Sequence, residues 1–471
     1  MKRAAGKHRV ESDLLGPLKV PAAAYWGVQT QRAMDNFKIS GVPLCHYPEI
    51  IRGLAMVKMA AARANHDCGV MSRKVMKGIE AACRDLMEGR FHDQFLVDMF
   101  QGGAGTSTNM NANEVIANRA LEHMGKRKGD YEFCTSHDHV NLSQSTNDAY
   151  PSAMHLAILL SNDTLTANLD RLVAAFRAKG REFRRIVKMG RTQLQDAVPM
   201  TLGQEFDAFA ESLADEVRML RRVEGALLEV NMGGTAIGTG LNAPRGFTRS
   251  CVKHLSKITG RKFTAAADLV EATQDTQAFV LYSSCLKSLA IKLSKICNDL
   301  RLLSSGPRAG FGEIRLPAKQ PGSSIMPGKV NPVVPEVVNQ VCFRVIGNDL
   351  TVTLAAEAGQ LQLNVMEPVI AASILEGQAL LRNAAEALRT QCVEGIEADA
   401  VACRAFVERS IGIVTALNPL LGYEKSTELA TEALRTGRGI VELVREQGLL
   451  TDKQIASVMD PARMAGTSRR R

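Results

Sequence analysis

The sequence contains little of what marks membrane, secreted or nucleic-acid-binding proteins. No apolar run in its 471 residues approaches the roughly 18 that a membrane span needs, and no secretory hydrophobic region follows the basic start. Aromatic residues make up only 5% of the chain, and no basic stripe with interleaved aromatics is present. These absences argue against membrane and nucleic-acid partners and predict an intracellular, cytoplasmic protein.

Cysteine is present in moderate number but lacks the spacing of a metal or redox site. The ten cysteines include no Cys-x-x-Cys pair. Half of them stand in segments with helical patterning, where cysteine acts as a small apolar residue: Cys83, Cys285, Cys297, Cys342 and Cys392. We therefore predict neither disulfides nor a zinc site, and nothing in the sequence indicates a required metal or organic cofactor.

The net charge of +9 is concentrated at the two ends of the chain. Seven of these nine charges belong to Lys2, Arg3, Lys7, Arg9, Arg469, Arg470 and Arg471. Positive and negative charges nearly balance in the rest of the chain. Its 45% hydrophobic and 23% charged content is that of a soluble globular protein, and its length predicts two to four domains.

Helical periodicity dominates the body after an irregular start at residues 9–30. A long bundle helix is predicted from apolar residues that alternate three- and four-residue steps: Leu286, Leu289, Leu293, Ile296, Leu300 and Leu303. A second helical region is expected at about 345–390, with a kink at Glu367-Pro368. Between them, residues 304–332 form a long loop, and Thr451 to Gln454 offer a capping box for a short terminal helix.

The most informative segment is Gly322-Ser323-Ser324-Ile325-Met326-Pro327-Gly328-Lys329-Val330-Asn331-Pro332. Its glycines permit a closable flap, and Asn331 with Pro332 suits the start of a helix. A serine is a poor base unless its alkoxide is stabilised, which Lys329 and loop N–H groups can do. Taken alone, a Ser-Ser pair is more often a solvated turn.

Two further polar clusters stand out. Residues 102–111 are too polar for a core strand and too rich in glycine for a helix interior, and the hydroxyl of Thr106 beside glycine backbone suits a carboxylate. Residues 139–148 place Ser145, Thr146 and Asn147 in a row before a helix that enters at Ala149. These neutral donors suit a dicarboxylate. A structural turn or a helix cap is the plain alternative for each cluster.

These segments, together with Gly190–Pro199, occur in the order typical of the aspartase/fumarase superfamily, which the chain resembles over about residues 10–465. Members of this superfamily eliminate across a C–N or C–O bond to release fumarate. The Lys-Val-Asn-Pro ending resembles the aspartase and fumarase branch rather than the argininosuccinate or adenylosuccinate lyases. Ser136-His137-Asp138 departs from the Pro-Asn-Asp turn of fumarases, so their peripheral anion site is not carried over.

Two segments favour ammonia elimination within this branch. Fumarases normally have a histidine at Gln193, which acts with a glutamate matching Glu336. Glutamine cannot be a general acid or base, but it can hydrogen-bond an amino group. Gly359–Pro368 and Asp13–Thr30 also resemble aspartases. The expected reaction is the reversible deamination of L-aspartate to fumarate, and the alternatives are hydration of fumarate, elimination from a substituted aspartate, or a non-catalytic relative.

The resemblance also implies residue roles and assembly. Ser323 is expected to be the base that removes the Cβ proton, in the field of Lys329. Substrate-binding residues are expected to be Thr106, Ser145, Thr146, Asn147, Thr192, Gln193, Ser324 and Asn331. The implied fold is all-α with three domains, placed at 1–143, 144–398 and 399–471. The family forms a homotetramer around a twenty-helix core, and each site combines segments of three subunits.

Overall fold

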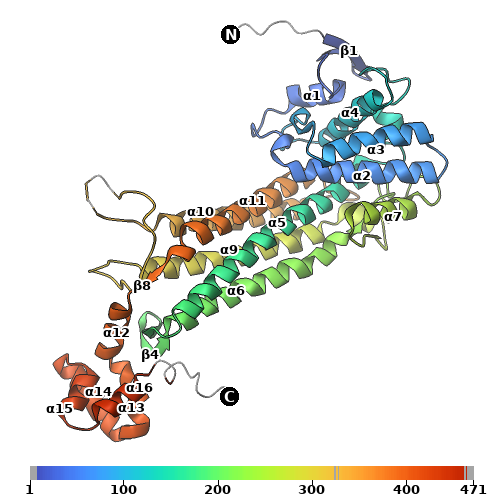
Figure 1. The fold of residues 1–471 in the computed structure, drawn as a ribbon. Coiled ribbons are helices and arrows are strands. Elements are labelled where there is room, and N and C mark those ends of the chain that lie inside the picture. Colours follow the sequence, from blue (N-terminus) through green and yellow to red (C-terminus); the bar gives the residue numbers. More distant parts are fainter. Residues whose placement is uncertain (1–7, 323–324, 327, 461–462, 464–471) are drawn as a thin grey trace. The chain divides into compact units, whose positions relative to one another are not determined.

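The computed structural model describes residues 8–322, 325–326, 328–460 and 463. The chain forms two compact units. The first contains the chain up to Leu165 with Met219–Lys287 and Arg344–Leu380, and the second contains Thr166–Arg218, Ser288–Phe343 and the chain from Leu381. Long helices contribute to both units: α5 (Thr146–Glu182), α6 (Leu202–Val223), α9 (Gln277–Leu303), α10 (Val333–Glu357) and α11 (Glu367–Gln391) (Figure 1).

The predicted all-α class is confirmed, because the strands in the described part of the chain form only two-stranded pairs. The first unit adds β1 (His8–Asp13), β2 (Gly16–Pro21), α1 (Val28–Asn36), α2 (Pro48–Asp67), α3 (Arg73–Met87), α4 (Thr106–His123), a π-helical turn at Ser136–Val140, β5 (Glu229–Val230), α7 (Phe247–Thr259), β6 (Thr264–Ala265) and α8 (Glu271–Gln274). None of the helices in the described ranges is long and apolar enough to cross a membrane.

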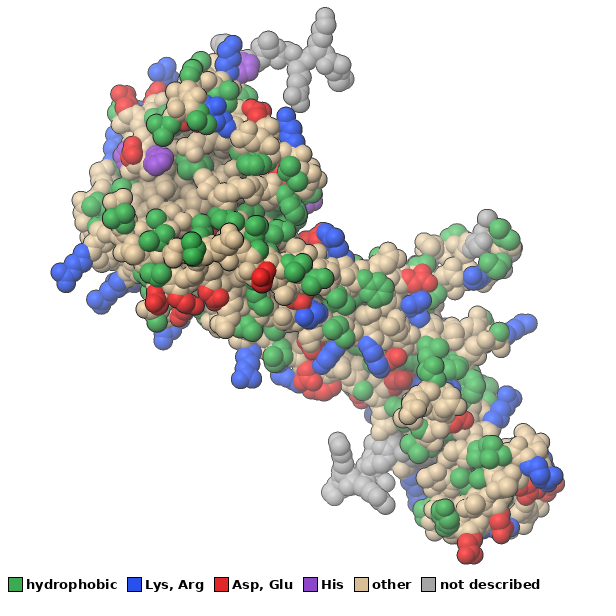
Figure 2. All heavy atoms as spheres, turned by 180° about the vertical axis from the view of Figure 1, so that it is seen from behind, with side chains coloured by type: hydrophobic (Ala, Val, Ile, Leu, Met, Phe, Trp, Pro, Cys, Tyr) green, Lys and Arg blue, Asp and Glu red, His purple; other side chains and the backbone are tan. Residues whose placement is uncertain are grey.

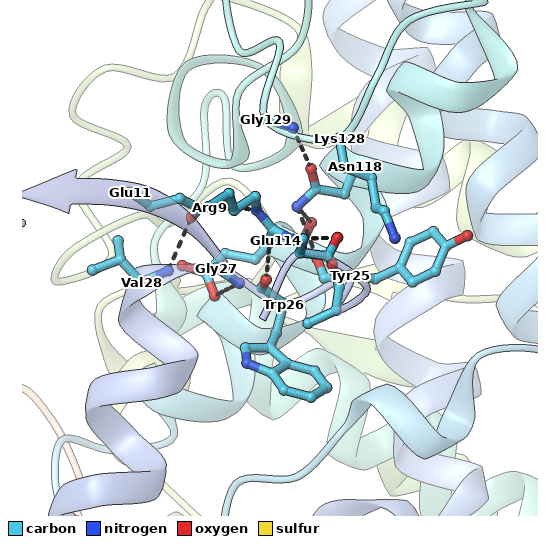
Figure 3. Close-up of polar contacts among 12 residues, drawn as sticks. Arg9, Glu11, Tyr25, Trp26, Gly27, Val28, Glu114, Asn118, Lys128 and Gly129 are labelled. Carbon is cyan, nitrogen blue, oxygen red and sulfur yellow. Dashed lines mark hydrogen bonds and ion pairs between the residues drawn. The ribbon is translucent and has the colours of Figure 1, made fainter. Parts of the chain in front are cut away.

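A buried carboxylate joins the start of α1 to α4 (Figure 3). Glu114 of α4 accepts hydrogen bonds from the backbone N–H groups of Gly27 (2.8 Å), Gln29 (2.8 Å) and Thr30 (3.1 Å), and from Thr30 Oγ1 (2.6 Å). Three of these donors are N–H groups at the start of α1, where no intrahelical acceptor exists. Burial raises the pKa of Glu114, and the four donors oppose that shift.

Polar contacts also order the helices of the first unit. Tyr282 of α9 is fully buried and donates from its hydroxyl to Asn162 Oδ1 on α5 (2.7 Å). Gln378 of α11 donates from Nε2 to Tyr282 Oη (2.6 Å) and to the Ile158 carbonyl (3.0 Å). These bonds set α5, α9 and α11 side by side within this unit.

The second unit contains the predicted leucine stripe from Leu289 onward and the C-terminal helices. In α9 the stripe from Leu286 to Leu303 is buried throughout, as predicted. The other elements are β3 (Val187–Thr192), β4 (Gln195–Thr201), β7 (Ile314–Arg315), β8 (Glu397–Ala398), α12 (Ala400–Arg409), α13 (Val414–Leu421), α14 (Tyr423–Thr436), α15 (Ile440–Glu446) and α16 (Asp452–Val458). The capping box predicted for Thr451 and Gln454 is present at the start of α16.

The helical region expected at about 345–390 is present, but a full break between two helices takes the place of the kink expected at Glu367-Pro368. Two helices occupy this region, since α10 ends at Glu357 and α11 begins at Glu367. Asn364 stabilises the break: its Nδ2 donates to the carbonyls of Ala355 (2.9 Å) and Ala356 (3.2 Å), and its Oδ1 accepts from the Met366 N–H (2.8 Å). Pro368 then lies in the first turn of the new helix, where its missing N–H has no cost.

The cysteines lie where apolar residues would. All ten are free thiols, and Cys83, Cys297, Cys342 and Cys392 are buried, while Cys285 is half-buried. Burial raises the pKa of the Cys342 and Cys392 thiols to about 12. Thiols held neutral in this way are inert small side chains.

Candidate active site

The first candidate segment forms the start of α4. A Cβ at Gly105 would lie 2.6 Å from the ring of Tyr150, so only glycine permits this approach. Thr106 is the first residue of α4; its side chain is exposed, and its Oγ1 donates to the Gly103 carbonyl (2.6 Å). The expectation that this segment would not be helical is therefore wrong for Thr106–Asn111, because the glycines end just before the first turn.

Asn109 connects α4 to the second candidate segment. Its Nδ2 donates to Thr146 Oγ1 (3.0 Å) and to Asn141 Oδ1 (3.2 Å). Thr146 is the first residue of α5, which begins three residues earlier than the predicted entry at Ala149. The structure thus brings together the helix starts that carry Thr106 and Thr146.

A buried lysine supports the loop that leads into α5. Lys58 of α2 is fully buried, and its Nζ donates to Asn141 Oδ1 (2.9 Å) and Gln144 Oε1 (3.0 Å). Burial lowers the pKa of Lys58 to about 7, and the charge of Asp148 acts in the opposite direction. Since both acceptors belong to the loop with Ser145, Lys58 fixes the backbone from which the candidate hydroxyls project.

Asp148 joins the same loop to a glycine-rich segment at residues 231–242. Its carboxylate accepts from the N–H groups of Ser145 (2.9 Å), Gly233 (3.1 Å) and Thr235 (3.0 Å). Burial raises the pKa of Asp148 to about 6, and these three N–H groups lower it. Asn147 lies between the two segments, because its Nδ2 donates to the Ala236 carbonyl (2.7 Å).

A hollow of about 320 Å³ lies beside Ser145 in the first unit. Eight of its eleven lining residues are of polar type, and they come from the π-helical turn, the loop before α5 and the glycine-rich segment: His137, Asp138, Asn141, Leu142, Ser143, Gln144, Ser145, Thr235, Ala236, Leu241 and Asn242. This volume is at the lower end of the range for small-molecule sites, as suits a four-carbon dicarboxylate.

Removing the Lys58 ammonium is expected to change how stability depends on pH. Between the folded pKa of about 7 and the usual 10.5, the unfolded chain holds a proton that folded Lys58 does not. The free energy of unfolding of the unmodified protein therefore rises with pH in this window, by up to about 1.4 kcal/mol per unit relative to Lys58→Met. Denaturant unfolding at pH 8 and 10 measures the difference.

Lys74→Met is the matched control, because Lys74 lies on the exposed side of α3. The free energy of unfolding of Lys74→Met is expected to differ from that of the unmodified protein by the same amount at both pH values. A constant difference for Lys58→Met as well would contradict the lowered pKa.

The third candidate segment is a tight hairpin in the second unit. β3 ends at Thr192 and β4 begins at Gln195, so Gln193 and Leu194 form the turn with φ of +54° and +61°. Thr192 and Gln193 are exposed, and Leu194 is 67% exposed. The hairpin therefore presents both candidate side chains to the outside of the chain.

The fourth candidate segment is described only in part, because Ser323 and Ser324 lie outside the described residues. Gly322 lies against the Lys329 carbonyl so closely that a Cβ there would be 1.5 Å from its oxygen. The two ends of the segment are thus in contact. Lys329 is exposed. Asn331 lies two residues before the start of α10, so Pro332 precedes the helix and Pro335 lies in its first turn.

Sequence reasoning missed Lys58, Asp148 and the segment 231–242. The glycines of Gly233-Gly234-Thr235-Ala236-Ile237-Gly238-Thr239-Gly240 were a signal for a special backbone. Nothing in the sequence indicated that Lys58 would be buried, since it stands in an ordinary helical pattern. Among the described residues, no group of three or more His, Cys, Asp or Glu side chains could hold a metal ion.

Comparison with protein families assigns the class. Residues 16–347 match the family model described as Lyase, and residues 413–466 match the one described as Fumarase C C-terminus. The chain belongs to the aspartase/fumarase superfamily of lyases.

Individual relatives narrow this assignment. The aspartate ammonia-lyase of Pseudomonas aeruginosa is 60% identical over 97% of this chain and 96% of its own length. A solved structure titled fumarate lyase:delta crystallin from Brucella melitensis is 55% identical, with a TM-score of 0.94 over 98% of this chain and 100% of that one. The class II fumarase of Schistosoma mansoni is 35% identical, with a TM-score of 0.90 over 98% of this chain and 99% of that one.

Proposed function

We propose that this protein is an aspartate ammonia-lyase, which catalyses the reversible elimination of ammonia from L-aspartate to give fumarate. The observation that carries the proposal is the 60% identity to a relative of that name, against 35% to a class II fumarase. The substrate is then a small dicarboxylate, and no organic cofactor is proposed. The cytoplasm is the proposed location.

Ser323, as an alkoxide, would take the Cβ proton of aspartate. This proton is weakly acidic, so the charge that develops on the adjacent carboxylate needs strong stabilisation. The electron pair then forms the carbon–carbon double bond as the C–N bond breaks and ammonia leaves. The proposed donors to the enediolate are Thr106, Ser145, Thr146 and Ser324.

The hydrogen bonds of the first unit support two of these donors. Thr146 Oγ1 accepts from Asn109 Nδ2, and Ser145 Oγ accepts from the Asn147 N–H (3.2 Å). A hydroxyl that accepts in this way keeps its own proton for another acceptor, such as a carboxylate. Thr106 differs, because its proton is directed to the Gly103 carbonyl, so it must rotate to serve as a donor.

Recognition of the other end of the substrate is proposed for residues of several segments. Thr192, Lys329 and Asn331 would hold the second carboxylate. Asn147 or Gln193 would contact the amino group. The Nδ2 of Asn147 donates a hydrogen bond to the Ala236 carbonyl. The Oδ1 of Asn147 can therefore serve as the acceptor that an ammonium group needs.

A homotetramer is proposed, with each site combining segments of three subunits in the domains 1–143, 144–398 and 399–471. An exposed apolar stripe on α10 supports self-association. Phe343, Leu350 and Leu354 are 63%, 60% and 60% exposed, and they share one helix face with Gly347. Figure 2 shows further apolar side chains between the charged ones on the face that it draws. Residues of this kind gain free energy when a second copy covers them.

The proposed activity is tested by incubating the purified protein separately with L-aspartate and L-malate and following fumarate by its ultraviolet absorbance. Fumarate and one equivalent of ammonia are expected from L-aspartate. Fumarate from L-malate alone would replace the proposal by fumarate hydratase, and no product from either substrate would favour a non-catalytic relative or one that needs a substituted aspartate.

A further inference from the structure

Four charged side chains, two of them buried and two half-buried, lie at the base of the β3–β4 hairpin, all within the second unit. Lys188 Nζ donates to Glu205 Oε2 (2.6 Å) and forms an ion pair with Glu313 Oε2 (2.9 Å), while Arg191 Nη1 donates to Glu313 Oε1 (2.8 Å). The side chains of Lys188, Arg191 and Glu313 are 3%, 11% and 0% exposed. Two cations and two carboxylates therefore balance in a site where an unpaired charge would be costly.

Arg191 is also clamped by aromatic rings. Its guanidinium carbon lies 4.2 Å from the ring centre of Phe311 and 5.1 Å from that of Phe406 on α12. The two rings are 6.1 Å apart and meet edge to face. A planar guanidinium can stack on rings and donate to a carboxylate at once, whereas an ammonium group makes only the charged contact.

The hairpin is also part of the hydrophobic core of the C-terminal helices. Met189 of β3 is fully buried in one cluster with Val407, Ile413 and Leu417. The register of β3 against β4 shifts between Met189 and Arg191. A β-bulge of this kind changes the direction in which the following side chain points. Met189 and Arg191 thus both face inward, while Thr192 and Gln193 remain exposed at the tip.

We propose that Arg191 is a positioning residue, which sets the orientation of the Thr192–Gln193 tip by joining β3 to Glu313 and to the Phe311–Phe406 clamp. The inference rests on the proposed function, in which this tip holds the second carboxylate and the amino group of aspartate. It adds a role for the C-terminal helices in substrate recognition, because Phe406 forms one side of the clamp. Arg191 touches no reacting atom.

Arg191→Lys tests the proposal with the buried charge kept. The lysine retains a cation near Glu313 but loses the ring stacking and the planar donor geometry. The KM for L-aspartate is expected to rise at least about 10-fold, because misplaced binding groups cost this much or more. The kcat is expected to change less than KM, because Thr192 of the tip holds the carboxylate that takes no part in bond breaking.

Arg315→Lys is the matched control. Arg315 is on β7, two residues after Glu313 in the sequence. Its side chain is 66% exposed and forms an ion pair with Asp399 (2.8 Å). Exposed ion pairs contribute little, so its KM is expected to stay within about 2-fold of the unmodified value. Equal KM values for the two lysine variants would overturn the proposal.

A charge-balanced double variant separates positioning from stability. Arg191→Met alone leaves two carboxylates facing Lys188, whereas Arg191→Met with Glu313→Gln restores the balance. We expect the double variant to have the melting temperature of the unmodified protein, while its KM for L-aspartate stays raised. Recovery of both quantities would show that Arg191 is only structural.

Amide hydrogen exchange gives a readout that does not depend on turnover. Peptides covering residues 190–197 are expected to exchange faster in Arg191→Lys than in Arg315→Lys. If the unmodified protein did not deaminate aspartate, the proposed function would fail while faster exchange would still support the positioning role. Unchanged exchange in an active protein would reject the positioning role alone.

Discussion

Ser323→Ala is expected to lower the rate of fumarate release from L-aspartate by at least about 1,000-fold, the range typical of removing a positioned proton-transfer group. Alanine has no oxygen to accept the Cβ proton. Lys329, six residues further along the chain, supplies a cation in the same short segment. The measurement is the initial rate at saturating aspartate.

The control for Ser323→Ala is Ser304→Ala, in the same long loop. Ser304 Oγ donates to the Arg301 carbonyl three residues earlier (3.3 Å), so its removal is expected to leave the rate within about 2-fold. Binding of succinate, which has both carboxylates but no leaving group, should persist in Ser323→Ala. A rate above about one tenth of the unmodified value would reject Ser323 as the base.

Leu350→Asp combined with Leu354→Asp is expected to dissociate the proposed tetramer and to abolish activity. Both leucines lie on the exposed apolar stripe of α10, at 60% exposure each. Covering a leucine in an interface contributes about 1.5–3 kcal/mol, and an unpaired carboxylate there costs at least as much. The loss of association free energy is repeated at every copy of the interface in the proposed tetramer. Light scattering gives the mass, and the fumarate assay gives the activity.

Leu434→Asp is the control for this pair, because Leu434 is 72% exposed but belongs to a different helix, α14. It is expected to leave mass and activity unchanged. Full activity in a dissociated monomer would contradict the sharing of sites between subunits. An intact tetramer in the double variant would instead show that α10 is not the interface.

Local patterns in the sequence were sufficient for most of the helices. The apolar spacing from Leu286 to Leu303 predicts the buried face of α9, and the Thr451–Gln454 pair predicts the start of α16. Such signals are local, because helix faces and caps depend on residues three or four apart. The interruption at Glu367-Pro368 was expected only as a kink, because the full break between α10 and α11 depends on the Asn364 side chain, which hydrogen-bonds back to the end of the preceding helix.

The candidate hydroxyls and the family were also available from the sequence alone, because they stand in contiguous motifs around Thr106, Ser145, Thr192 and Ser323. Only the tertiary structure decided what surrounds them. It buries Lys58 beneath Asn141, brings Gly233 and Thr235 to Asp148, and anchors the Thr192–Gln193 hairpin on Glu313 and Phe406. Each of these contacts joins residues far apart in the chain, so no local spacing encodes it; burial and charge balance in the folded protein do.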